Sequence, residues 1–88
     1  MNQESHKLEA NFNTLVISIA SSAMMALGLA PHPNSDDMEK DLKVAQFNID
    51  LLLLLKTKTH SNLNDEEEKL INNVLSDLQL KFIENKEV

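Results

Sequence analysis

The chain has 88 residues, no cysteine, and a net charge of −6 that comes from 14 acidic residues against 8 basic ones, all of them lysine. A chain of this length forms one domain with a marginal core, and without cysteine it has neither disulfides nor a thiolate metal site. The acidic charge, the missing arginine and an aromatic content of three phenylalanines argue against a nucleic-acid partner, because phosphates bind basic surfaces and bases stack on aromatic rings.

Glycine occurs once and proline twice, while hydrophobic residues make up 42% of the chain. This composition predicts an all-α fold, since strands and their turns usually need more glycine and more β-branched residues. The uncharged segment LVISIASSAMMALGLA is about 16 residues long and contains three serines, which is short of the roughly 20 apolar residues that cross a bilayer. Lys7 stands between Glu4 and Glu9, which does not resemble the positive start of a secretory signal. We therefore expect a cytoplasmic protein without a membrane span.

Residues 1–9 are predicted to form a flexible tail, followed by a single helical domain over residues 10–85. The first helix is expected over residues 12–28, with Gly28 as its left-handed C-terminal cap. Its opposite side is uncharged, whereas a helix facing water normally carries charges there, so we expect this side to be covered. The predicted core stripe is Phe12, Leu15, Val16, Ile19, Ala23, Ala26 and Leu27; the outer side is Thr14, Ile17, Ser18, Ser21, Met24 and Met25.

The second helix is expected over residues 37–58, with Asp36 and Glu39 forming a capping box at its start. At about 100° per residue its apolar side chains fall into two opposed groups separated by polar strips, one of which carries Asp41 and Asn48. We therefore expect a helix held between partners on two sides. One group is Met38, Leu42, Ala45, Ile49, Leu52 and Leu53; the other is Val44, Phe47, Leu51, Leu54 and Leu55.

The third helix is expected over residues 65–84, before a short tail at residues 86–88. Asn64 is its predicted N-cap, and Glu67 stands at the spacing of a capping box. The acidic residues of its first turn suit the positive end of the helix dipole. Its predicted core face is Leu70, Ile71, Val74, Leu75, Leu78 and Phe82, with Leu80 and Ile83 off that face.

Four segments together resemble the small bacterial proteins known as domain of unknown function 1844. They are FNTLVISIASSAMMALG, DLKVAQFNIDLL, KTHSNLNDEE and LSDLQLKFIE, and the likeness runs from about Phe12 to Glu84. The resemblance implies no catalytic or binding residues, because the family has no established activity. The family usually has glycine where this chain has Ser61, arginine where it has Gln79, and tyrosine where it has Phe82.

The polar segment between the last two predicted helices is the strongest candidate for a chemical site. Lysines there, with the free amides at the start of the third helix, could bind an anion, but no P-loop glycines are present and four acidic residues follow. The alternative is a capped turn, which we favour. The candidate residues are Lys58, Thr59, His60, Ser61 and Asn62.

No other pattern predicts a metal, a cofactor or catalysis. His6, His32 and His60 lack the spacing of metal ligands, and Asp36 and Asp37 near His32 are better explained as residues at a helix start. The acidic residues 65–68 lack the glycine and alternating ligands of a calcium loop. The hydroxyls of the first helix, at residues 18, 21 and 22, have no neighbouring base, and residue 50 is expected on a polar strip rather than buried.

Three functions remain, and an enzyme is the weakest of them, because no paired carboxylates, activated nucleophile or cofactor motif supports it. The favoured one is a structural or protein-interaction module that acts as a homodimer or a higher homo-oligomer, without enzymatic activity, assembled as a dimeric helical bundle. The alternative leaves the second apolar stripe open as a groove for a hydrophobic ligand or for a helix of another protein. The residues predicted at the interface are Val44, Phe47, Leu51, Leu54, Leu55, Ile17, Met24 and Met25.

Overall fold

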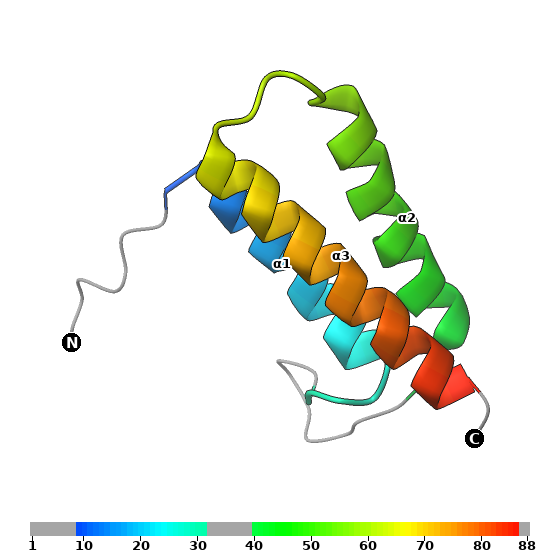
Figure 1. The fold of residues 1–88 in the computed structure, drawn as a ribbon. Coiled ribbons are helices and arrows are strands. Elements are labelled where there is room, and N and C mark those ends of the chain that lie inside the picture. Colours follow the sequence, from blue (N-terminus) through cyan, green and yellow to red (C-terminus); the bar gives the residue numbers. More distant parts are fainter. Residues whose placement is uncertain (1–8, 32–39, 87–88) are drawn as a thin grey trace.

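The computed structural model describes residues 9–31 and 40–86, and these form three helices. In chain order they are α1 (Phe12–Ala26), α2 (Leu42–Lys58) and α3 (Asp65–Lys86), and no strand occurs among the described residues (Figure 1). The predicted all-α fold is therefore confirmed. The proposed tail over residues 1–9 falls almost wholly outside the described part of the chain, as do residues 87 and 88.

Both ends of α1 are closed by local hydrogen bonds. The Asn11 side chain accepts a hydrogen bond from the backbone N–H of Thr14 at 2.8 Å, which makes Asn11 the N-cap. At the other end Gly28 has φ 78, and the N–H groups of Gly28 and Leu29 donate to the carbonyls of Met25 and Met24, both at 3.0 Å. This pair of bonds is a Schellman motif, so Gly28 is the left-handed cap that the sequence predicts.

The start of α2 differs from the prediction. The helix begins at Leu42 rather than at residue 37, because Asp41 is the N-cap: its backbone is extended, and its carboxylate accepts from the Val44 N–H at 3.2 Å. Lys40 and Asp41 are not helical. The capping box proposed for Asp36 and Glu39 lies outside the described residues.

The turn between α2 and α3 depends on one residue with a left-handed backbone. Ser61 has φ 72, the only positive φ of a non-glycine residue in the described ranges. A Cβ atom makes this conformation unfavourable, and glycine avoids the cost. The conformation of Ser61 therefore explains why glycine suits this position.

The N-terminus of α3 is the capping box that the sequence predicts. The Glu67 N–H donates to Asn64 Oδ1 at 2.8 Å, and the Asn64 N–H donates to Glu67 Oε1 at 3.0 Å. The helix continues to Lys86, two residues beyond the predicted end.

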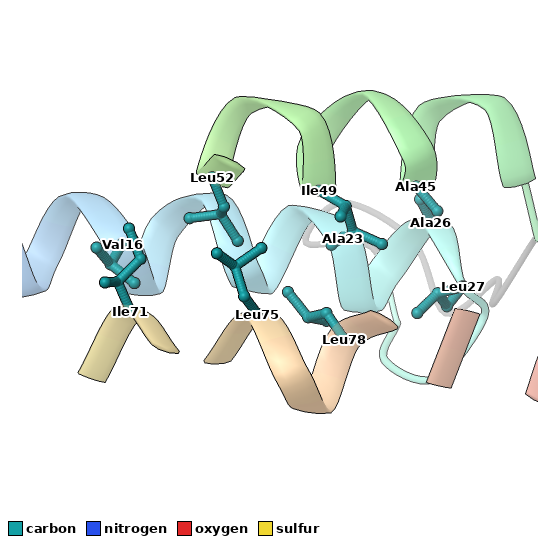
Figure 2. Close-up of a cluster of buried hydrophobic side chains, with 10 residues drawn as sticks. All are labelled: Val16, Ala23, Ala26, Leu27, Ala45, Ile49, Leu52, Ile71, Leu75 and Leu78. Carbon is teal, nitrogen blue, oxygen red and sulfur yellow. The ribbon is translucent and has the colours of Figure 1, made fainter. Parts of the chain in front are cut away.

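The core lies where α2 and α3 both pack against α1 (Figure 2). Leu52 of α2 and Leu75 of α3 point toward one another beside α1. Three alanines in the core keep α1 and α2 close, because small side chains let two helix backbones approach. The buried hydrophobic residues are Val16, Ala23, Ala26, Leu27, Ala45, Ile49, Leu52, Ile71, Leu75 and Leu78.

Five residues lie differently from the predicted helix faces. Leu55 is expected in the second apolar group of its helix, with the interface residues, but it is half-buried and packs against the core. Periodicity places Leu15 and Leu53 in core stripes, but they are 46% and 39% exposed. Met24 is expected on the outer side of its helix but is half-buried and packs against the core. Asn48 is expected on a polar strip but is buried, and its side-chain amide donates to the Val44 carbonyl at 3.0 Å. Each of these residues lies at the border between two faces, where packing by a neighbouring helix decides the outcome.

Candidate interaction surface

The side of α2 that faces away from α1 and α3 carries apolar side chains at the positions Val44, Phe47, Leu51 and Leu54, which we call the outer stripe. Their 3-4-3 spacing aligns them along one face of the helix. Val44, Phe47 and Leu54 are 44%, 61% and 54% exposed, and Leu51 is half-buried. The two opposed apolar faces predicted for this helix are therefore present, and no described residue covers one of them.

The two edges of the outer stripe differ in chemistry. One edge carries Lys43 and Asp50, both exposed, and Asp50 accepts a hydrogen bond from the Gln46 side chain at 2.9 Å. This places Asp50 on a solvated polar strip, as expected from the sequence. The other edge carries the buried Asn48 and the half-buried Leu55, which packs against the core. One edge is thus charged and wet, and the other is continuous with the interior.

The interface residues predicted on α1 lie apart from the outer stripe. Ile17, Met24 and Met25 line a hollow of about 400 Å³ beside the segment that follows α1. Its other lining residues are Ala20, Ser21, Ala30 and Pro31, and none comes from α2. The predicted interface residues thus belong to two helices, and the three on α1 line a hollow to which α2 contributes no side chain.

The candidate loop site is built chiefly as a turn. Thr59 donates its hydroxyl to the Leu55 carbonyl at 2.7 Å, and the Asn62 backbone N–H donates to the Thr59 carbonyl at 2.8 Å. The Asn62 side chain donates to the His60 carbonyl at 3.4 Å. These bonds use the polar groups of the loop to close the chain between two helices, which supports the turn interpretation.

A cavity of about 250 Å³ nevertheless lies under this turn. Thr59, His60 and Ser61 of the candidate loop line it, whereas Lys58 and Asn62 do not. The remaining lining residues are Lys56, Leu63, Glu68 and Ile71. The cavity mixes one carboxylate with cationic, hydroxyl and apolar groups, and this combination does not select a ligand class.

Two further polar contacts lie away from the outer stripe and the loop: the Lys40 side chain donates to the Asn85 carbonyl at 3.1 Å, and an ion pair lies within α3. Lys81 and Asp77 form an ion pair at 2.9 Å, and the pKa of Lys81 is raised by its hydrogen bond to Asp77 and by the charge of that carboxylate. Asn72 Oδ1 is buried without a hydrogen-bond partner in the described part of the chain. Ser18 and Ser21 are exposed on α1, and Ser22 is half-buried.

Only one of the candidate metal ligands in the sequence lies in the part of the chain that the structure describes. His60 lies on the exposed turn, whereas His6, His32, Asp36 and Asp37 lie outside the described residues. Within residues 9–31 and 40–86, no three side chains of the histidine, cysteine and acidic types converge as metal ligands would.

The family model described as Domain of unknown function (DUF1844) matches residues 9–84. This match covers nearly the whole chain and confirms the resemblance drawn from the four segments. No curated protein and no solved structure matches the chain. None of the helices in the described ranges has the length and apolar character needed to cross a bilayer.

Proposed function

Because this chain belongs to the family called Domain of unknown function (DUF1844), whose activity is not established, we propose its function from the surface: a small interaction module that acts as a homo-oligomer through the outer stripe of α2. The exposure of Val44, Phe47 and Leu54 at helical spacing carries the proposal. A second copy of the chain supplies the apolar surface that would remove this stripe from water.

The free energy available from the stripe favours this assignment. Burying a half-exposed large apolar side chain contributes about 1 kcal/mol. Four such positions on each of two copies therefore supply a substantial driving force for association. The core is small by comparison, because among the described residues it holds ten buried hydrophobic side chains, three of them alanine. A small domain of this kind gains stability when it shares a core with a second copy.

The outer stripe alone is too small for a stable dimer interface. It spans the 11 residues from Val44 to Leu54, or about 15 Å of helix, whereas a stable interface buries on the order of 800 Å² on each partner. Surface beside the stripe must therefore join it.

The proposal includes no catalytic activity. The residues that the sequence offers for chemistry are a turn whose hydrogen bonds close the chain, exposed serines on α1, and an aspartate held by Gln46 on a solvated edge. None of these has the nucleophile–base geometry that catalysis by a side chain requires.

Light scattering after size exclusion at micromolar concentration tests the proposal. We expect a mass of two chains or a larger whole multiple of 9.9 kDa. A folded monomer at 9.9 kDa across this concentration range would overturn homo-oligomerisation. It would leave the outer stripe open to a hydrophobic ligand or to a helix of a different protein.

A further inference from the structure

The spacing of the outer stripe is the same in both directions along α2. Val44, Phe47, Leu51 and Leu54 are separated by 3, 4 and 3 residues, so the stripe is symmetric about the position of residue 49. A second, antiparallel α2 that is centred on this point places residue 44 against residue 54 and residue 47 against residue 51. Every apolar side chain of the stripe then meets another apolar side chain.

The unlike edges of the stripe also distinguish the two possible directions. When two identical helices pair in parallel around a two-fold axis, the edge bearing Lys43 and Asp50 faces the opposite edge of the second copy, which bears Asn48 and Leu55. Asp50 would then face an apolar side chain. When they pair antiparallel, each edge faces itself, so charged groups stay together on the solvated side and buried groups stay together on the inner side.

From these two observations we propose that α2 pairs with α2 of a second copy in antiparallel orientation. The two-fold axis crosses the outer stripe at the level of residue 49 along the helix. This inference rests on the proposed function and names the arrangement of that interface. Along the solvated edge the order becomes Lys43, Asp50 of the second copy, Asp50, and Lys43 of the second copy. Each carboxylate therefore has a lysine on its outer side.

The approach of the two Asp50 carboxylates opposes this arrangement only weakly. Both are exposed, and an exposed charge pair changes a dissociation constant by severalfold at most. The eight apolar side chains contributed by two outer stripes outweigh that repulsion, because the burial of their apolar area contributes more free energy than an exposed charge pair costs. The position of the axis is therefore set by the apolar overlap.

Spin-label distances test the orientation directly. The chain has no cysteine, so Asp50→Cys and Thr57→Cys each place one nitroxide per copy. Both positions are exposed, and they stand seven residues apart on the same edge of α2. With a rise of 1.5 Å per residue, the antiparallel arrangement separates the two copies of residue 57 by about 24 Å along the helix and those of residue 50 by about 3 Å.

We therefore expect a distance below about 20 Å for the label at residue 50 and about 25–30 Å for the label at residue 57, given helix axes about 8–10 Å apart. Equal distances at the two positions in a dimer would overturn the antiparallel arrangement and leave the proposed function standing. Distances above about 40 Å at both positions would place the interface elsewhere and overturn the pairing of α2 with α2. Absence of any dimer would instead overturn the proposed function itself.

Discussion

Leu52 and Phe47 occupy opposite sides of the same helix: Leu52 is fully buried beside α1, and Phe47 is 61% exposed. Five residues of helix separate them by about 140° around its axis. A helix of a single small domain needs one apolar face, which Leu52 provides. The exposure of Phe47 therefore needs a different explanation, and a second copy of the chain gives one.

Phe47→Trp should report the association by fluorescence. The chain has neither tryptophan nor tyrosine, so the emission comes from the introduced side chain alone. We expect the emission to move to shorter wavelength as the protein concentration rises through the dissociation constant, because the indole leaves water. Phe82→Trp is the matched control, since Phe82 already packs against the core and should show no concentration dependence. Emission from position 47 that stays constant up to high micromolar concentration would contradict an interface there.

Local features of the fold were the most predictable from the sequence. The cap at Gly28 and the box of Asn64 and Glu67 depend on residues a few positions apart, so their pattern is sufficient to identify them. The opposed faces of α2 follow from helical periodicity alone. The start of α2 was harder to place, because residues 36 and 41 are both acceptable caps and each is an aspartate.

Border positions could not be predicted because they depend on which flank a neighbouring helix covers. Leu53 lies about 100° from Leu52 around α2, and this rotation leaves it 39% exposed. Asn48 is buried because α1 and α3 pack on the inner side of α2, which periodicity does not reveal. The separation of Ile17, Met24 and Met25 from the outer stripe likewise follows from the arrangement of the helices and not from the pattern within each one.

Leu52→Ala should be strongly destabilising. The side chain is fully buried between α1 and α3, so truncation removes apolar contacts and leaves a cavity that costs about 2–5 kcal/mol of unfolding free energy. Urea denaturation followed by circular dichroism measures this loss. Leu53→Ala removes the same atoms from the next residue, which is 39% exposed, and should cost about 1 kcal/mol. Equal losses for the two variants, compared at one protein concentration, would contradict the assignment of the core face.

Ser61→Gly should stabilise the chain. Ser61 has φ 72, where a Cβ atom is unfavourable, and its removal should raise the unfolding free energy by about 1 kcal/mol. The same substitution at Ser76, which is exposed within α3, should instead lower the unfolding free energy by about 0.5 kcal/mol, because glycine is the poorer helix former. Thermal unfolding of each variant shows whether the substitution raises or lowers the unfolding free energy. Destabilisation by Ser61→Gly would contradict the left-handed turn.

If the outer stripe of α2 binds a second copy, a charge introduced there should separate the copies, whereas the same charge on another exposed helix face should not. Leu54 on the outer stripe and Leu80 on α3 are 54% and 56% exposed, so Leu54→Asp and Leu80→Asp introduce the same charge at nearly equal exposure. The measurement is the mass of each variant by light scattering at micromolar concentration, with circular dichroism to show that both are folded. We predict a folded monomer of about 9.9 kDa for Leu54→Asp and the mass of the unaltered oligomer for Leu80→Asp. An unchanged oligomer for Leu54→Asp, or its loss for Leu80→Asp alone, would show that the outer stripe of α2 is not the surface that binds the second copy.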